Sequence, residues 1–381
     1  MAERGGESVN IVFPSRLRRL FRRSKTAAAC WRGYARSKAA RRAVERQLDE
    51  GEPCDLVVYL TPGADKITGG IISIVSLCKE TQALRDADGS VSVLCTLPDE
   101  PRLAMYSAVE DPHVVLPLER VLRGRRPVRS LVLNVPANRS ETVIDSCGEA
   151  LWESMASIPF FHVNVLLQNI DNAPGRAAVQ RLIATADRVT ATTAHERYCT
   201  PEVRESLGIP LHRLSVWISP EQYRFVDYAD KEDLMLVSPD PHPERDTVMA
   251  AIARACPHIR MEVVRNLSYR EYKELAAKAK WSLTFGEGLD GYFIEPVFSG
   301  AVACAVYNDR FFTPEFSEHP SVFESYQQMV DGIGEFLSAY DEAEKFQELQ
   351  QRIYDQCEAQ YSGQRYRHNL NLFFEGRYTF P

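Results

Sequence analysis

The sequence of 381 residues lacks the features of several common protein classes. No apolar run reaches the roughly 20 residues that a membrane-spanning helix needs, and the early stretch VNIVF is too short for the core of a signal peptide. The nine cysteines are scattered singly without a Cys-x-x-Cys pair, which argues against a zinc site and against a disulfide scaffold. We therefore expect a cytoplasmic protein whose cysteines are reduced.

Negatively charged residues are scarce in residues 1–50. Residues 1–50 carry 13 Lys/Arg against 5 Asp/Glu, a net of +8, which leaves −15 for the rest of a chain whose net charge is −7. Arginines interleaved with apolar residues over 14–48 predict a basic helical arm, which we expect to dock on an anionic membrane surface. A solvated helix face and nucleic-acid binding are the alternatives, and we regard nucleic acid as an unlikely partner. A second basic stretch covers residues 120–130, and the family resemblance described below would place it in the domain that binds the acceptor.

Short apolar runs alternate with amphipathic segments along the rest of the chain, a pattern typical of parallel sheets covered by helices on both faces. The expected strands are 55–60, 90–97, 129–135, 162–170, 187–193 and 213–218, then 233–238, 259–264, 280–286 and 301–307. The expected final helical stretches are 325–360 and 364–375. A polar segment near 219–233 is the expected hinge between two Rossmann-like halves.

The stretch FGEGLDGYFIEPVFSG, residues 285–300, follows one of these strands and leads into a short helix. Ligands bind at the carboxyl ends of parallel strands, and glycines let backbone N–H groups approach a ligand closely. Because Pro296 suits a first helical turn, the helix is expected to begin between Phe293 and Glu295. Glu287 and Glu295 would lie roughly 12 Å apart along a helix, too far for a retaining glycosidase pair at about 5 Å. An elongated ligand gripped at two points fits better.

This stretch resembles the Glu-x7-Glu segment of retaining GT-B glycosyltransferases of family four. Glu287, Gly288, Glu295 and Gly300 match at the family's spacing. Three positions depart from it, because the family's phenylalanine, second glycine and proline are replaced by Leu289, Asp290 and Val302. The segment TGGIISI resembles the family's Gly-Gly loop, and the resemblance covers about residues 50–365. It implies an α/β GT-B fold, with two Rossmann-like domains and a cleft between them.

The division of the chain follows from this resemblance and from the alternation of elements. We expect a basic helical arm over 1–50, an acceptor domain over 51–222 and a donor domain over 223–362. Residues 363–381 are expected to form a helix and tail that cross back to the N-terminal domain.

The resemblance also implies roles for particular residues. Glu295 would bind the nucleotide ribose, and Glu287 would lie near the transferred sugar as a catalytic residue. Arg245 would be the second catalytic residue, in the lysine position of the family's basic pair, although Pro239 occupies the arginine position. Lys79 or Arg265 could compensate. The remaining donor-binding residues would be Gly69, Gly70, Gly288, Gly291, Tyr292 and Phe293.

The positions of the other polar residues relative to the expected strands and helices indicate their roles. Gln168 and Asn169 end an expected strand, and with His242 they are possible contacts to sugar or acceptor. His162 is expected to be a core histidine and His195 a helix-start residue. Asp86-x-Asp88 ends a helix at a glycine turn, so we interpret it as a solvated turn. Because backbone N–H groups can stabilise a leaving phosphate, no metal and no other cofactor is expected.

The sequence therefore predicts a retaining, metal-independent glycosyltransferase that moves a sugar from a nucleotide-diphosphate donor to a glycan or lipid-linked acceptor. Bacterial surface polysaccharide or glycolipid synthesis is the expected setting, at the inner face of the membrane. Two alternatives stay open. One is a GT-B-fold sugar epimerase, and the other is a non-catalytic protein that binds a sugar nucleotide or glycan.

Overall fold

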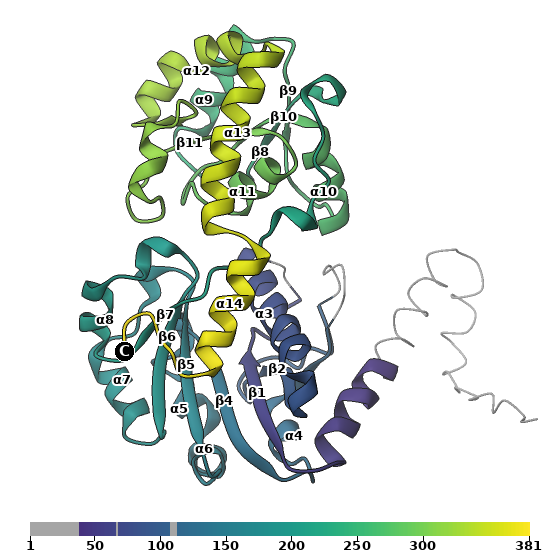
Figure 1. Cartoon of the computed structure of the whole chain (residues 1–381), viewed down its shortest axis with the longest axis vertical. Coiled ribbons are helices and arrows are strands. Elements are labelled where there is room, and N and C mark those ends of the chain that lie inside the picture. Colours follow the sequence, from purple (N-terminus) through teal and green to yellow (C-terminus); the bar gives the residue numbers. More distant parts are fainter. Residues whose placement is uncertain (1–37, 66–67, 107–112) are drawn as a thin grey trace, which may run out of the picture.

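The chain forms two parallel sheets that lie one above the other with helices around each (Figure 1). The computed structural model describes residues 38–65, 68–106 and 113–381. Most of the expected basic arm, residues 1–37, lies outside the described residues. Within them, no helix is both long enough and apolar enough to cross a bilayer.

The N-terminal sheet has seven strands in the order β3-β2-β1-β4-β5-β6-β7. Strand β1 is buried on both faces, because Leu56 and Val58 enter one core and Val57 and Tyr59 the other. This double burial explains why its sequence is a continuous apolar run rather than an alternating one. The strands are β1 Cys54–Leu60, β2 Val91–Thr96, β3 Val115–Pro117, β4 Val128–Pro136, β5 Phe161–Leu167, β6 Arg188–Thr193 and β7 Leu211–Arg213.

The C-terminal sheet has five strands in the order β12-β11-β10-β8-β9, and its neighbouring strands are parallel. Trp281 of β10 is fully buried in its core against Phe336 and Phe346. The strands are β8 Glu232–Val237, β9 Arg260–Val263, β10 Ala279–Leu283, β11 Val302–Val306 and β12 Val322–Phe323. An α/β architecture of two mostly parallel sheets, as the alternation predicted, is confirmed.

Helices follow most strands and cover the sheets. In the N-terminal half they are α3 Gly69–Arg85, α4 Leu118–Leu122, α5 Val143–Cys147, α6 Glu149–Ala156, α7 Arg176–Ile183 and α8 Pro201–Leu207. In the C-terminal half they are α9 Arg245–Ala255, α10 Tyr269–Lys278, α11 Gly291–Phe298, α12 Tyr326–Tyr340 and α13 Ala343–Gln360. Helix α14, Gly363–Phe374, follows α13 directly.

Two predicted elements differ from the observed ones, and two short strands were not predicted. Strand β7 ends at Arg213, where the predicted strand 213–218 begins, because its partner β6 ends at Thr193 and offers no further backbone to pair with. The predicted helical stretch 325–360 is two helices. Its break lies at Asp341, whose carboxylate accepts hydrogen bonds from Lys280 Nζ at 2.8 Å and from the Tyr228 hydroxyl at 2.9 Å. The two-residue strand β12 and the three-residue strand β3 carry too few residues for a recognisable pattern.

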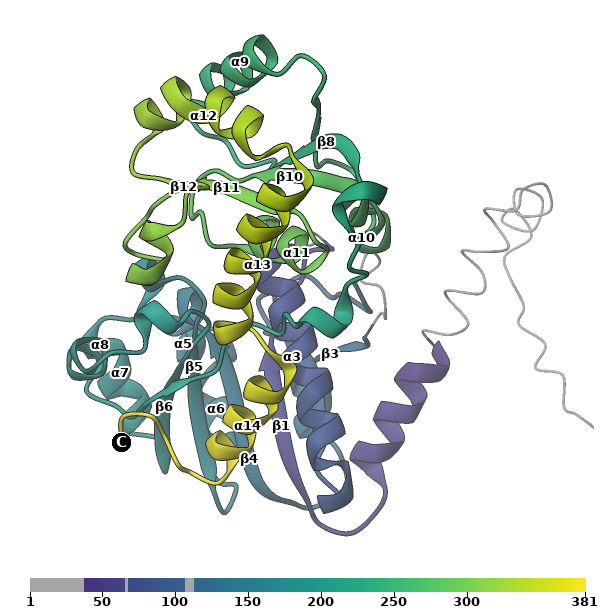
Figure 2. The same cartoon turned by 45° about the horizontal axis from the view of Figure 1, so that its top comes forward.

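Helix α14 returns from the C-terminal half and packs on the N-terminal half (Figure 2). Its residues Tyr366, Leu370 and Phe373 belong to the core beneath α3. The chain then continues beyond α14 to Phe380, which pairs with Leu211 of β7 through two backbone hydrogen bonds of 2.8 and 2.9 Å. Residues 363–380 therefore complete the N-terminal half.

The amino edge of the N-terminal sheet, opposite the C-terminal half, holds the basic stretch 120–130. Arg120 pairs with Asp49, Arg129 with Asp55, and Arg126 donates to the carbonyls of residues 47, 52 and 89. These arginines hold the helix 38–49 and its following turn against the sheet. The expectation that 120–130 lies at an acceptor site is wrong, because this stretch leads from α4 into the first residues of β4, at the amino end of that strand, whereas ligands bind beyond the carboxyl ends.

Candidate functional site

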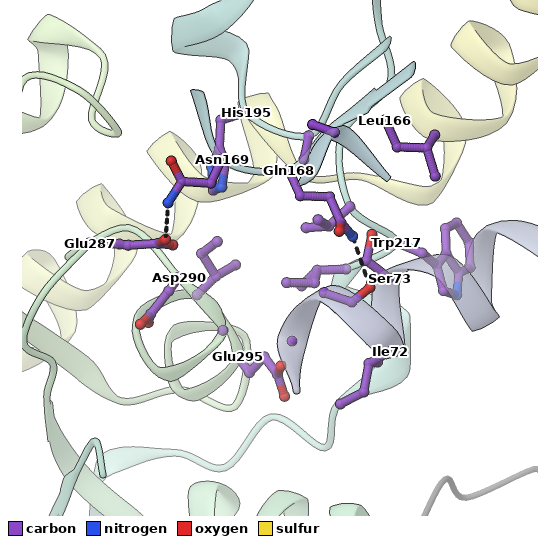
Figure 3. Close-up of a pocket in the computed structure, with 18 of the residues that line it drawn as sticks. Ile72, Ser73, Leu166, Gln168, Asn169, His195, Trp217, Glu287, Asp290 and Glu295 are labelled. Carbon is purple, nitrogen blue, oxygen red and sulfur yellow. Dashed lines mark hydrogen bonds between the residues drawn. The ribbon is translucent and has the colours of Figure 1, made fainter. Parts of the chain in front are cut away.

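A cleft lies between the two halves, where the carboxyl ends of the N-terminal strands face the C-terminal half (Figure 3). It consists of two cavities of about 330 and 730 Å³. Both are lined by Gly69, Gly70, Ile72, Tyr269, Glu287, Asp290, Gly291 and Glu295. The two cavities are therefore neighbouring compartments with one junction, and the starts of helices α3 and α11 lie at that junction.

Helix α3 presents its N-terminus to the junction. Thr68 caps it, since the Thr68 hydroxyl accepts a hydrogen bond from Ile71 N at 3.3 Å. Gly69 has open space where a Cβ would lie, so its backbone borders the cleft directly. The side chain of Gln168, just after β5, donates to the Gly70 carbonyl at 2.8 Å and fixes the helix start (Figure 3). The free N–H groups and the helix dipole favour an anion here.

Helix α11 presents its N-terminus to the same junction from the other half. Asp290 caps it by accepting a hydrogen bond from Phe293 N at 3.1 Å. The helix therefore begins at Gly291, and the expected start between Phe293 and Glu295 is wrong. Pro296 lies inside the helix rather than in its first turn, where it leaves only one backbone hydrogen bond unmade. Aspartate is a preferred N-cap residue, so Asp290 is the sequence signal for this start, whereas the family resemblance marks it only as a replaced glycine.

Glu295 is buried at the junction, with 8% of its surface exposed. Burial raises the pKa of its carboxyl to about 7, although hydrogen bonds with the Tyr269 and Tyr223 hydroxyls oppose this shift. Its Oε2 atom has no hydrogen-bond partner. A Cβ on Gly291 would come within 2.8 Å of Glu295 Oε1. The missing side chain at Gly291 therefore makes room for this carboxylate.

Glu287 joins the two halves across the cleft. Its Oε1 atom accepts a hydrogen bond from Asn169 Nδ2 at 3.2 Å (Figure 3). Burial raises the pKa of the Glu287 carboxyl, and the nearby charge of Asp240 raises it further. Strand β5 positions Asn169 and strand β10 leads into the loop of Glu287. A carboxyl held in this way at a cleft is a candidate functional group.

The larger cavity lies on the side of the C-terminal half. Aromatic rings of Tyr272, Phe285 and Tyr292 line it, as does Arg265. Arg265 is the one Lys or Arg among the described residues that line either cavity. It precedes Asn266, whose φ of 56° lies in the left-handed region, a conformation that asparagine tolerates better than most residues. Stacking surfaces beside a cation suit a nucleoside with its phosphates.

Four of the sequence-predicted residues do not line the cleft. Arg245 is 9% exposed and donates to the carbonyls of Pro239 and Asp240 at 3.3 Å, so it braces the wall instead of facing a ligand. His242 stacks on Tyr326 with ring centroids 4.0 Å apart. Phe293 is fully buried among other aromatic rings. Gly288 has a φ of +83°, and a Cβ there would come within 2.5 Å of Phe312, so its role is in the loop conformation.

Most of the remaining predicted residues line the cleft. Gly69, Gly70, Gln168, Asn169, Glu287, Gly291, Tyr292 and Glu295 all line the cleft. Of the two candidates for the missing cation, Arg265 lines it and Lys79 does not. His162 is a core histidine whose Nε2 lies 2.8 Å from the Thr190 hydroxyl, as expected.

Several cleft residues were missed by the sequence analysis. Asp240 follows β8 and Asn138 follows β4, so the rule that ligands meet strand ends could have found both. His195 starts a short 3-10 helix, as expected, but it also lines the smaller cavity, and burial lowers the pKa of its imidazole to about 4. Asp290 is half-buried at the junction, and desolvation together with the charges of Asp240 and Glu287 raises its pKa well above the usual range.

The two halves also meet in a clasp beside Glu287, formed by Asp171, Arg197, Asp309 and Arg310. Arg310 pairs with Asp171, and Arg197 Nε donates to the Asp309 carbonyl at 2.7 Å. Asp171 follows Asn169, and its backbone N–H donates to Asn169 Oδ1 at 2.9 Å. The clasp is therefore continuous with the hydrogen bond that holds Glu287.

The acidic groups of the cleft do not form a metal-binding cluster. Across the ranges 38–65, 68–106 and 113–381, no three or more His, Cys, Asp or Glu residues are grouped so that they could hold a metal ion. The N–H groups of two helix starts and Arg265 are the positive groups that the described part of the cleft offers to an anion.

Comparison with known proteins finds similar structures but no similar sequence. No family model and no curated protein sequence matches the chain. An alpha-glucosyltransferase solved with UDP and a 13-mer DNA superposes with a TM-score of 0.56 at 10% identity, covering 86% of this chain and 100% of that one. The sucrose-phosphate synthase of Thermosynechococcus elongatus gives 0.52 at 10% identity, covering 84% and 98%. HepE of Anabaena, solved with UDP-glucose, gives 0.51 at 11% identity, covering 84% and 99%. The chain therefore has the GT-B fold that these glycosyltransferases share.

Proposed function

We propose that this protein is a retaining glycosyltransferase that moves a sugar from a nucleotide-diphosphate donor to a glycan or lipid-linked acceptor. One observation carries the proposal: two helix N-termini, at Gly69 and Gly291, meet at the junction of two cavities beside Glu287 and Glu295. Such a junction suits a diphosphate, with the nucleoside in the larger cavity and the sugar in the smaller one. Two of the structural neighbours support it, since the alpha-glucosyltransferase was solved with UDP and HepE with UDP-glucose.

The transfer step follows from these groups. The bond between the anomeric carbon and the β-phosphate oxygen breaks, and its electron pair leaves with the diphosphate. The N–H groups at Gly69, Gly70 and Gly291 and the Arg265 guanidinium stabilise that charge. The acceptor hydroxyl oxygen bonds to the anomeric carbon on the face that the diphosphate leaves, and its proton passes to the departing phosphate oxygen. No metal ion has a necessary role in this scheme.

The two glutamates have different tasks in the proposal. Glu295 accepts hydrogen bonds from the ribose hydroxyls through its unpartnered Oε2 atom. Glu287 lies toward the smaller cavity, where its negative charge stabilises the positive charge that builds at the anomeric carbon. Asn169 orients Glu287 for this purpose.

The cellular setting is also part of the proposal. The basic arm, of which residues 14–37 lie outside the described part, would bring the enzyme to an anionic membrane surface at the cytoplasmic side. Surface polysaccharide or glycolipid synthesis would supply acceptors there.

The first experiment separates the roles of Glu287 and nucleotide binding. Glu287→Ala should lower turnover of the sugar nucleotide about 100-fold, because a charge aimed at the transition state is lost, while calorimetry should give an unchanged Kd for UDP or GDP. Glu335→Ala, a change at an exposed site on α12, is the matched control. NMR of the product would show whether the anomeric configuration is retained.

The outcome also decides between the competing functions. A non-catalytic binding protein would bind the nucleotide sugar and leave it intact in the presence and absence of acceptors. An epimerase would release an epimerised sugar without an acceptor. Either result would contradict the proposed transfer.

A further inference from the structure

We propose that the smaller cavity selects a neutral sugar, and that Glu287 is a specificity-determining residue that excludes donors whose sugar carries a carboxylate. The proposal rests on the proposed function, because it assumes that the smaller cavity holds the transferred sugar. It concerns the chemical class of the donor, which neither the fold nor the helix starts decide.

The position of the sugar follows from the division of the cleft. The aromatic rings and Arg265 lie in the larger cavity, and the two helix starts lie at the junction. A nucleotide sugar that places its base against the rings and its diphosphate at the junction must extend its sugar into the smaller cavity. Glu287 lines both cavities, so its carboxylate lies where the diphosphate ends and the sugar begins.

The walls of the smaller cavity offer neutral partners to a sugar. Its polar side chains from the N-terminal half are Ser73, Asn138, Gln168, Asn169, His195 and Asn172. Amide and hydroxyl groups donate to and accept from sugar hydroxyls. None of the described residues that line this cavity is a Lys or Arg, and the low pKa of His195 keeps its imidazole neutral at pH 7.

The side chains that line the cavity from the C-terminal half include three carboxyls, in an environment that disfavours negative charge. Glu287, Asp290 and Glu295 lie along its side in the C-terminal half, and the pKa of each carboxyl is raised. Besides burial, the negative charge of Asp240 raises the pKa of Glu287, and the charges of Asp240 and Glu287 raise the pKa of Asp290. A sugar carboxylate would add a further charge of the same sign while losing its water, without a cation to pair with. The neutral sugar has no such cost.

The experiment uses calorimetric titration of the full chain with matched donor pairs. UDP and GDP are titrated first. The pair UDP-glucose and UDP-glucuronate, or GDP-mannose and GDP-mannuronate, is then titrated for whichever nucleotide binds. We expect the neutral donor to bind at least tenfold more tightly than the uronate. Equal affinity, or tighter binding of the uronate, would overturn the proposal.

A variant tests the role of Glu287 separately. Glu287→Gln keeps the size of the side chain and removes its charge, so the ratio between uronate and neutral donor should shrink at least threefold. Glu335→Gln should leave the ratio unchanged. A ratio in Glu287→Gln that shrinks by less than threefold from its wild-type value would overturn the assignment to Glu287.

Failure of the proposed function gives a different result. Binding of neither UDP nor GDP would contradict the nucleotide-donor proposal itself, and the sugar inference would fall with it. Binding of a nucleotide with the opposite preference for the uronate contradicts only the sugar inference.

Discussion

The amino ends and the carboxyl ends of the strands in the N-terminal sheet, here called the amino edge and the carboxyl edge, differ in how their charged side chains are paired. At the amino edge, Arg120 and Arg129 form ion pairs with Asp49 and Asp55, and Arg126 is held by three backbone carbonyls. At the carboxyl edge, one buried oxygen atom of Asp240 (Oδ2) and one of Glu295 (Oε2) have no hydrogen-bond partner in the structure. The pKa values reflect the difference. A hydrogen bond from Arg120 lowers the pKa of Asp49, whereas burial raises the pKa of Glu295.

Buried charges without a partner mark the functional region of this molecule better than a high density of charge does. Charges whose partners lie in the same chain hold the structure together, and they gain nothing from a ligand. Buried charges without partners are costly to the apo protein, and such groups concentrate at functional sites. A dense cluster of arginines was the more visible sequence feature, yet the cleft with one arginine is the candidate site.

The largest expected contrast comes from the same substitution at the two edges. Gly69→Ala places a methyl group in open cleft space, so nucleotide binding should weaken about tenfold, or about 1.4 kcal/mol, without loss of stability. At Gly124, a Cβ would lie 2.6 Å from the Leu48 carbonyl oxygen. Gly124→Ala should therefore destabilise the fold by about 1–3 kcal/mol and leave binding intact. Calorimetry and urea unfolding measure the two effects.

Equal losses of stability in Gly69→Ala and Gly124→Ala would contradict the predicted difference between the two edges. Gly69 would then support the start of α3 and not a ligand. The predicted difference would also be contradicted if Gly124→Ala weakened nucleotide binding in its folded state, since the amino edge would then be coupled to the cleft.

A smaller effect concerns the pH dependence of the cleft. Because the pKa of Glu295 is about 7 in the folded protein and near its ordinary value when unfolded, the folded state binds more protons between these two values. Stability of the ligand-free protein should therefore fall as pH rises from 4.5 to 7, by on the order of 2 kcal/mol. Urea unfolding at several pH values measures this slope, and Glu295→Gln should remove the share that Glu295 contributes, leaving the share of Glu287 and Asp290.

Nucleotide affinity should follow the opposite course. The ionised Glu295 accepts ribose hydrogen bonds, so binding of UDP or GDP should tighten as pH rises through 7. Since nucleotide phosphates also titrate near this pH, the informative quantity is the difference between wild type and Glu295→Gln. An identical pH profile in both proteins would remove Glu295 from the binding site.

The smallest effect tests whether an ion pair at the cleft has more than a structural role. Arg310 and Asp171 of the clasp have side chains 49% and 53% exposed, and the pair Arg181–Asp145, within the N-terminal half, is similarly exposed at 48% and 65%. Arg310→Ala should lower turnover two- to fivefold, since Asn169 and Glu287 lose a neighbouring support. Arg181→Ala should leave turnover unchanged.

Charge reversal makes the clasp prediction sharper. Arg310→Asp combined with Asp171→Arg should restore most of the turnover that either single reversal removes. If the double variant remains as slow as the singles, the clasp affects turnover through its local structure and not through the ion pair.

The sequence predicted most of the fold because its strands are continuous apolar runs and its helices are amphipathic. It could not give the direction of side chains. Arg245 occupies the predicted place at the start of α9, yet its guanidinium turns to the carbonyls of Pro239 and Asp240. Likewise, the arginines of 120–130 were assigned to the correct half but to the wrong edge of the sheet. Periodicity identifies an element, whereas only its packing decides which end of it meets a ligand.

The crossing of α14 has a consequence for how the protein is made. During synthesis, residues 363–380 leave the ribosome only after the whole C-terminal sheet, yet they supply Tyr366, Leu370 and Phe373 to the first core and pair Phe380 with Leu211. The N-terminal half therefore cannot complete its folding as a nascent chain. Residues 363–380 reach the N-terminal half only after the C-terminal half has been synthesised. The N-terminal half therefore completes its folding last, although it is translated first.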